Sequence, residues 1–328
     1  MDTKPKSNEI RITRVYDASV QIVWEAWTDP QRAAHWWGPR GFTITTHSKD
    51  FRVGGTWVYT MHGPNGMDFP NKSQYLEIEQ GSRMVYDHWG NEQSRALFRV
   101  TVQFTDVKGK TKMDMVMAFP TSEAAEATKV FIKKAGGNAT WDRLAEYLEK
   151  QASNKEVFVI NRSFDVPIET LFDLWTDPKL FTQWLPPTGF TMRFIKVDIR
   201  EGGEGFYEMT DGGKTTMFGR VNYRDIRRPS KIVYTQEFSD KDGNISRHPM
   251  APTWPETMLT TVSLTEEGAD HSRATVTWEV FGKATPEEVN TFSRARAGMT
   301  QGWTGSFDKL ENDLANSHAQ SRTSKDGA

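Results

Sequence analysis

The sequence predicts an α+β protein built from two domains of one kind, each an antiparallel sheet with helices on one face. Two matching segments predict the duplication: WTDPQRAAHWWGPRGFT begins at Trp27, and WTDPKLFTQWLPPTGFT begins at Trp175. In the ungapped alignment of Ile12–Met61 with Ile160–Met209, 18 of 50 positions are identical. The 148-residue spacing is the size of a whole domain, whereas solenoid repeats have periods of about 20–50 residues. Alternating apolar residues later in each copy favour antiparallel strands with one buried face.

Each copy opens with a short strand, over residues 9–17 in the first copy and 156–165 in the second. A helix follows, because apolar residues recur at positions i, i+3, i+4 and i+7. They are Val20, Val23, Trp24 and Trp27, and then Ile168, Leu171, Phe172 and Trp175. Asp29 and Asp177 stand at N-cap positions, and the proline after each begins a second short helix. The next segments, WWGPRGF and WLPPTGF, contain proline and glycine and are predicted loops with large apolar side chains.

A double glycine begins the strand region of each copy, at Gly54–Gly55 and Gly202–Gly203. It predicts a turn or bulge, which Arg52 and Arg200 are expected to brace. Beyond it, alternation places Trp57, Tyr59 and Met61 on one strand face, and Tyr207 and Met209 on the matching face. The same alternation returns in four later runs, at Phe98–Phe104, Met113–Phe119, Thr260–Leu264 and Val276–Val280.

Each copy closes with an amphipathic helix. Its apolar stripe comprises Trp141, Leu144 and Leu148 in the first copy, and Trp303, Phe307, Leu310 and Leu314 in the second. Alignment of Leu144 with Leu310 places Gly137 opposite Trp303, which predicts the roomier cavity in the first domain. The second copy also carries a capping box at Thr285–Glu288 and a 12-residue insertion with Pro249, Pro252 and Pro255.

The predicted domains span residues 9–150 and 157–315, with a linker over 151–156 and a disordered tail over 316–328. With 41 basic and 43 acidic residues the net charge is −2, so neither nucleic acid nor a membrane is expected as a partner. The absence of cysteine excludes disulfides, thiol nucleophiles and cysteine-bound zinc. No apolar run approaches the length of a membrane span or of a signal segment, and we therefore expect a cytoplasmic protein.

Together these features resemble the domain family named after the activator of Hsp90 ATPase homologue, within the START/Bet v 1-like superfamily. The resemblance rests on WTDP, the Trp-Pro-Gly-Phe loop, the D-x-R-x-G-G turn, the antiparallel strands and the terminal helix, which in the second copy contains MTQGWTGSFDKL. It covers residues 9–150 and 156–315. The resemblance implies a helix-grip fold, in which a curved sheet wraps around the terminal helix and leaves an apolar cavity between them.

We expect this cavity to bind a hydrophobic or aromatic small molecule without catalysis, because apolar pockets with few polar groups suit such ligands. No catalytic residue, metal site or cofactor is predicted. The residues expected to line the two cavities are Trp37, Phe42, Trp57, Tyr59, Met61, Met113, Met115, Met117, Trp141, Phe190, Tyr207, Met209, Trp278 and Trp303. For two sets of these residues, the aromatic loops and the methionine stripe Met113, Met115 and Met117, a purely structural role is the alternative to ligand binding. The aromatic loops either plug the sheet or close over a ligand, and the methionine stripe either fills the core or lines the cavity.

Two other functions stay open. The family resemblance implies a co-chaperone-like module that binds a chaperone or another protein. An enzyme of the cyclase or hydrolase kind would need inward polar groups, for which His62, Asp114 and Glu208 are candidates, although alternation places Asp114 and Glu208 on the outer face. His62 could also meet Asp87 and His88 as a metal or acid–base cluster, but isolated exposed histidines are the simpler interpretation.

Overall fold

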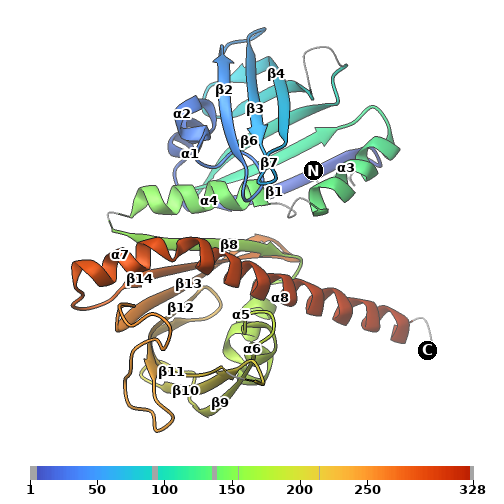
Figure 1. Ribbon diagram of the computed structural model, residues 1–328. Helices are drawn as coiled ribbons and strands as arrows, with labels where there is room; N and C mark the ends of the chain where they lie inside the picture. Colours follow the sequence, from blue (N-terminus) through green and yellow to red (C-terminus); the bar gives the residue numbers. More distant parts are fainter. Residues whose placement is uncertain (1–5, 91–94, 135–138, 154, 214, 326–328) are drawn as a thin grey trace. The chain divides into compact units, whose positions relative to one another are not determined.

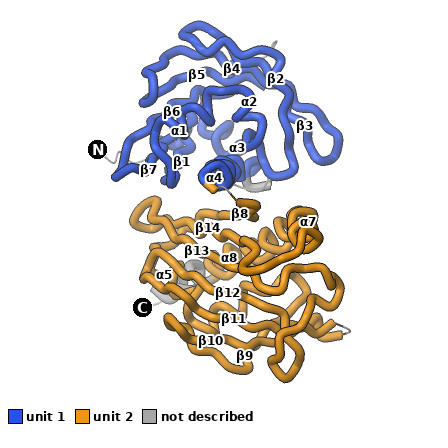
Figure 2. Tube along the Cα trace, turned by 90° about the vertical axis from the view of Figure 1, so that its left-hand side faces the viewer, with its two compact units in different colours: residues 1–152 blue, residues 153–328 orange. Residues whose placement is uncertain are grey.

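A computed structural model describes residues 6–90, 95–134, 139–153, 155–213 and 215–325. The chain divides into two compact units, residues 1–152 and 153–328 (Figure 2). Each unit has its own hydrophobic core of buried aromatic and aliphatic side chains. Within the described residues, every helix is too short or too polar to cross a bilayer.

The first unit is a seven-stranded sheet with four helices among its described residues (Figure 1). Its strands follow the order β1-β7-β6-β5-β4-β3-β2, and every neighbouring pair is antiparallel. The elements are β1 (Glu9–Tyr16), α1 (Val20–Thr28), α2 (Pro30–Ala33), β2 (Thr43–Lys49), β3 (Thr56–His62), β4 (Asp68–Glu79), β5 (Arg83–Trp89), β6 (Phe98–Val107), β7 (Lys110–Ala118), α3 (Ser122–Lys134) and α4 (Ala139–Ala152).

The second unit repeats this arrangement, with strand order β8-β14-β13-β12-β11-β10-β9. The elements are β8 (Val157–Phe164), α5 (Ile168–Thr176), α6 (Pro178–Trp184), β9 (Thr191–Val197), β10 (Glu204–Thr210), β11 (Thr216–Arg227), β12 (Lys231–Ser239), β13 (Thr257–Gly268), β14 (His271–Val280), α7 (Pro286–Arg294) and α8 (Arg296–Lys325). Each unit is thus a curved antiparallel sheet with a terminal helix against its concave face, the helix-grip fold that the sequence predicted (Figure 1).

The predicted caps form. The carboxylate of Asp29 accepts hydrogen bonds from the backbone of α2, at 2.7 Å from Gln31 N and 3.2 Å from Arg32 N. Asp177 caps α6 in the same way, and Thr285 with Glu288 forms a complete capping box at the start of α7. These short polar contacts satisfy backbone N–H groups that have no partner within the helix.

The double glycine is required by a tight turn before β3. Gly54 has a φ of +82°, and a Cβ on Gly55 would lie 2.2 Å from the carbonyl oxygen of Asp50. Arg52 pairs with Asp50 at 2.8 Å, which braces the turn as expected. Gly202, Gly203 and the Arg200–Asp198 pair repeat this geometry in the second unit.

Two predicted boundaries differ from the structure. α8 continues to Lys325, where a disordered tail from Asn316 was expected, because neither glycine nor proline interrupts the chain between Leu310 and Lys325. Residues 326–328 lie outside the described part. α4 likewise runs through Gln151 to Ala152, two residues into the expected linker.

Candidate ligand cavities

The aromatic loop after α2, residues 36–42, has one tryptophan in the core and one that faces the cavity. Trp36 is fully buried, and its indole N–H donates to the carbonyl of Ala26 at 3.0 Å. The next residue, Trp37, faces the cavity and donates to the hydroxyl of Tyr59 at 3.2 Å. In the second unit, Trp184 is buried and donates to Leu174. The loop therefore both plugs the sheet and forms part of the cavity wall.

The terminal helix of each unit stacks one tryptophan on the first helix. Trp141 of α4 lies on Trp27 with ring centroids 5.2 Å apart and planes 10° apart. Trp303 of α8 lies on Trp175 at 5.9 Å and 25°. Trp141 is therefore the counterpart of Trp303. The predicted alignment of Gly137 with Trp303 is wrong by about one helical turn, and Gly137 itself lies outside the described residues.

The terminal helix also fixes the aromatic loop. In the first unit, Arg143 of α4 donates to the carbonyl oxygens of Gly38 at 2.8 Å, Pro39 at 2.9 Å and Phe42 at 3.1 Å. These bonds satisfy carbonyl groups of the loop from outside it, and the oxygen of Pro39 also accepts from the backbone N–H of Phe42 at 3.1 Å. Sequence reasoning missed Arg143, because no local pattern links it to a loop a hundred residues earlier.

Different residues take this role in the second unit. The Ser306 hydroxyl donates to the carbonyl of Leu185 at 2.6 Å, and the Lys309 ammonium donates to that of Pro186 at 2.6 Å. The two units thus hold the same loop by unrelated side chains, so the repeat did not reveal these contacts.

The first cavity has a volume of about 480 Å³ and lies between β3–β7, α3 and α4. Seven of the predicted residues line it: Trp37, Phe42, Tyr59, Met61, Met115, Met117 and Trp141. Trp57 and Met113 do not line it, contrary to prediction, because both lie at the far end of their strands. Trp57 packs against Trp37 and Tyr59, and Met113 contacts the hydroxyl of Tyr16.

Five polar side chains in this cavity were not predicted as lining residues: Asn71, Tyr86, His88, Thr128 and Thr140. Burial lowers the pKa of His88 to about 4, so its imidazole is neutral near pH 7. The ring stacks on Phe98 at 4.7 Å, and its Nδ1 lies 3.4 Å from the Ser73 hydroxyl. Burial also raises the pKa of Tyr59 and Tyr86, which keeps both hydroxyls protonated. A sheet register taken from the sequence could have placed Tyr86 here, because it is the counterpart of Tyr234.

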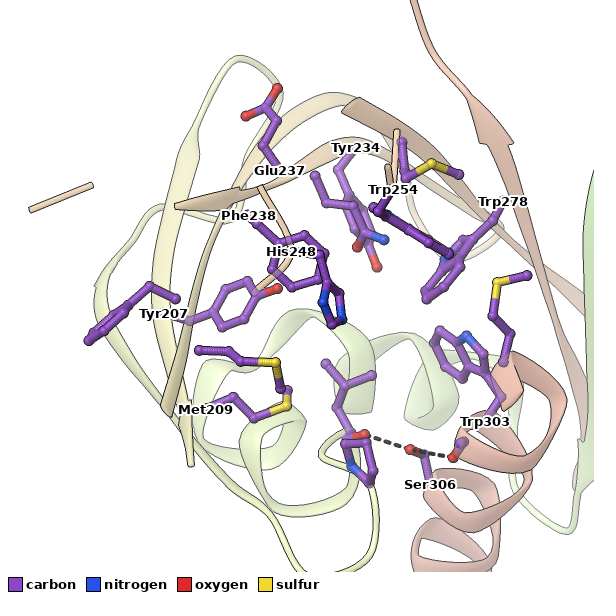
Figure 3. Close-up of a pocket in the computed structure, with 18 of the residues that line it drawn as sticks. Tyr207, Met209, Tyr234, Glu237, Phe238, His248, Trp254, Trp278, Trp303 and Ser306 are labelled. Atoms are coloured by element: carbon purple, nitrogen blue, oxygen red, sulfur yellow. Dashed lines mark hydrogen bonds between the residues drawn. The ribbon is translucent and has the colours of Figure 1, made fainter. Parts of the chain in front are cut away.

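The second cavity is smaller, about 270 Å³ (Figure 3). Four predicted residues line it: Tyr207, Met209, Trp278 and Trp303. Phe190 does not line it, contrary to prediction; it follows the turn at Gly189, where the loop leads away into β9. The first cavity is thus the larger, as expected, but the reason given from Gly137 is wrong. One difference in the walls is that Met117 of β7 stands where β14 has Trp278.

The insertion of the second unit supplies part of its cavity wall. His248, Trp254 and Glu256 come from the segment between β12 and β13 and line the cavity. Three contacts attach this segment to α7. They are an Arg247–Glu288 ion pair at 2.6 Å, a Thr253–Thr291 hydrogen bond at 2.8 Å, and an edge-on contact of Trp254 with Phe292 at 5.9 Å. The sequence predicts that this proline-rich insertion partly covers the second cavity, and its lining residues agree with that prediction.

Three of the candidate acid–base side chains, His62, Asp114 and Glu208, lie outside both cavities. His62 pairs with Asp68 at 2.7 Å, and Asp114 accepts a hydrogen bond from Thr13 at 2.6 Å. Glu208 forms an ion pair with Arg193 across the outer face. Asp87 pairs with Arg99, whereas His88 points into the cavity, so His62, Asp87 and His88 do not converge. Among the described residues, no three His, Asp or Glu side chains gather as metal ligands.

Three solved structures are among those with a fold similar to part or most of this chain. A crystal structure from Nitrosomonas europaea has 19% identity and a TM-score of 0.42, and covers 45% of this chain and 99% of its own. A solution structure from Arthrobacter aurescens has 24% identity and a TM-score of 0.42, covering 47% and 94%. The di-domain ARO/CYC BexL from the BE-7585A biosynthetic pathway has 14% identity and a TM-score of 0.38, covering 93% and 97%.

No curated protein matches the chain. The family model for the activator of Hsp90 ATPase homolog 1-like protein matches twice, over residues 17–149 and 165–315. These two ranges contain both aromatic loops, six of the seven strands of each sheet and most of both terminal helices. The chain therefore belongs to the family of activator of Hsp90 ATPase homolog 1-like proteins and carries two copies of its domain.

Proposed function

We propose that each domain binds a hydrophobic or aromatic small molecule in the cavity between its sheet and its terminal helix, without catalysis. One observation carries the proposal: both units enclose a cavity walled by aromatic and methionine side chains, of about 480 and 270 Å³. Apolar walls with a few polar groups are typical of small-molecule sites. Methionine side chains such as Met115 and Met117 adapt their shape to varied apolar ligands.

The placement of the three acid–base candidates identified in the sequence favours binding over catalysis by these groups. A general acid or base must reach the substrate, whereas His62, Asp114 and Glu208 are engaged by other side chains outside the cavities. The cavity-facing tyrosines are also held protonated. Burial raises the pKa of Tyr207 to about 12, so it offers a hydroxyl donor at neutral pH rather than a base.

The proposal is tested by titration of the full chain with 1-anilinonaphthalene, a neutral fluorescent probe, and by one cavity-filling variant. Gly302 lines the second cavity, and a Cβ built there meets no atom within 4 Å. Gly302→Leu should therefore fill the cavity and remove the binding event in the second domain. Gly298 lies on the same helix, is exposed and is equally open. Gly298→Leu is the matched control, since both variants gain about 0.5–1 kcal/mol of helix propensity.

Enhanced fluorescence in the wild type and in Gly298→Leu, with a loss of part of the signal in Gly302→Leu, would support the proposal. If the wild type does not bind 1-anilinonaphthalene, the chain is not a binder of apolar aromatic molecules of this size. Equal binding by Gly302→Leu and Gly298→Leu would place the probe outside the second cavity.

A second candidate function is binding of a protein partner. α3 exposes two large apolar side chains, Val130 at 54% and Phe131 at 61%, next to the first cavity. Because the family is named for activation of the Hsp90 ATPase, the full chain can be added to an Hsp90 ATPase assay. If this function holds, stimulation should occur and should fall in Phe131→Ser. An unchanged ATPase rate would exclude this activity.

A further inference from the structure

The insertion places one imidazole in the second cavity. His248 lies half-buried between two aromatic rings, 4.6 Å from Phe238 and 6.5 Å from Trp254 between ring centroids. Figure 3 shows its ring pointing into the cavity, which Trp303 also lines. The equivalent region of the first unit is twelve residues shorter, so this group belongs to the second domain alone.

Its hydrogen bonding fixes which nitrogen carries the proton. The backbone N–H of Met250 donates to Nδ1 of His248 at 3.0 Å. Nδ1 must therefore be the acceptor nitrogen, and a neutral imidazole then has its proton on Nε2. Burial lowers the pKa of His248, which also favours the neutral ring. The side chain thus presents an N–H donor to the cavity, and its acceptor nitrogen is already used.

A tyrosine hydroxyl points into the same space. Tyr207 of β10 crosses directly over Gly219 of β11, where a Cβ would lie 2.4 Å from the phenol oxygen. Glycine at this position therefore allows the ring to lie flat against the sheet. Figure 3 shows the Tyr207 hydroxyl directed toward His248. Two donors consequently approach one region of a cavity whose other walls include Trp278 and Trp303.

We propose that His248 and Tyr207 form a donor subsite that selects aromatic ligands carrying a hydrogen-bond-accepting oxygen, such as an aryl ketone. The tryptophan walls would hold the flat ring, and the Nε2–H of His248 would donate to the oxygen. This inference rests on the proposed function, because it assigns the specificity of one of the two cavities. A ligand without the acceptor would leave both donors unpaired in a partly desolvated site, which costs affinity.

The test compares two ligands of nearly equal size, 2-acetylnaphthalene and 2-ethylnaphthalene, by calorimetric titration of the full chain. The wild type should bind the ketone about five- to tenfold more tightly, the effect of one neutral hydrogen bond. His248→Phe keeps a flat ring and removes the N–H, so it should bring the ketone to the affinity of the ethyl compound. His271→Phe makes the same change at an exposed position of the second domain outside the cavity and is the matched control, which should keep the wild-type preference.

Each result decides the proposal. Equal affinity for the two ligands in the wild type, a preference that survives His248→Phe, or its loss in His271→Phe would overturn the donor subsite while leaving the proposed function intact. Binding of neither ligand would instead contradict the proposed function. If His248→Phe does not fold, Tyr207→Phe removes the second donor and should lower the preference. A full wild-type preference in Tyr207→Phe would then overturn the shared subsite.

Discussion

Two tryptophan pairs join the first helix of each domain to its terminal helix. Trp27 and Trp175 are each only 3% exposed, and they stack on Trp141 and Trp303. Trp27 also packs edge-on against Phe104 of β6, so it connects helix, helix and sheet. The residues that define the repeat in the sequence are thus the centres of the two cores.

Replacement of Trp27 or Trp175 by alanine should lower the unfolding free energy of its domain by about 3–5 kcal/mol, the usual range for deletion of a core aromatic ring. Urea denaturation followed by circular dichroism measures the loss. Ile22 lies on the same helix as Trp27 and is 44% exposed, so Ile22→Ala is the control and should cost less than about 1 kcal/mol. A loss of under 1 kcal/mol for Trp27→Ala would show that the helix face is misassigned.

His88 makes the first domain sensitive to acid. Its folded-state pKa is about 4, below the ordinary value of 6.5, because burial penalises the charged ring. The contribution of the neutral His88 ring to the free energy of unfolding is therefore complete above pH 6.5, and it is lost as the pH falls toward 4. His88→Phe should lose less stability than the wild type between about pH 7 and pH 4.5 in urea melts.

The control for this pH dependence is His47→Phe, which changes an exposed imidazole on β2. It should keep the acid response of the wild type. Equal loss of stability in His88→Phe and the wild type would mean that His88 is not buried as a neutral group.

For single residues, the sequence predicted which strand faces line the cavities but not how deep each residue lies. Alternation placed Tyr59, Met61, Met115 and Met117 on the correct face. Alternation could not show that Trp57 does not line the cavity. It reports only which face of a strand a residue occupies, whereas the position of the cavity along the strand depends on how the whole sheet curves. The Gly137 error has a similar cause. Leucines recur every three or four residues along a helix, so two helices can be aligned one turn out of register.

Among the elements, the aromatic loop depends on the terminal helix. Arg143 binds three of its carbonyl oxygens, and removal of the guanidinium would take this partner from the oxygens of Gly38 and Phe42 in a partly buried position. Arg143→Met should therefore lower the stability of the first domain by about 2–4 kcal/mol. It should also weaken probe binding there, because Trp37 and Phe42 of this loop line the cavity.

Arg143→Lys separates charge from geometry, since lysine keeps the charge but cannot donate in the planar fork of arginine. It should recover only part of the lost stability, as measured in the same urea melts. A fully wild-type Arg143→Lys would show that charge alone is sufficient, and a stable Arg143→Met would show that the loop holds itself.

Elements were predictable where a local signal exists. The caps at Asp29, Asp177 and Thr285 and the double-glycine turns follow from short-range backbone chemistry, and the structure has all of them. α3 was not predicted, although Ser122–Lys134 is rich in helix-forming alanine, glutamate and lysine. The contacts of the insertion with α7 could not be predicted, because they join segments about 40 residues apart without a shared pattern.

For the whole molecule, we expect each unit to fold alone. Each has a complete sheet, its own terminal helix and a separate core. Fragments 1–151 and 154–328, expressed separately, should each unfold in one cooperative thermal transition by circular dichroism. A fragment without such a transition would contradict the independence of that domain.

Each domain is proposed to hold one apolar aromatic molecule in its cavity. Native mass spectrometry of the full chain with 1-anilinonaphthalene counts the bound molecules directly. Thr140 lines the first cavity, so Thr140→Phe should fill it as Gly302→Leu fills the second. We expect two bound probe molecules in the wild type, one in each single variant and none in the double variant. A wild type without bound probe, or a double variant that still binds two molecules, would contradict the proposal.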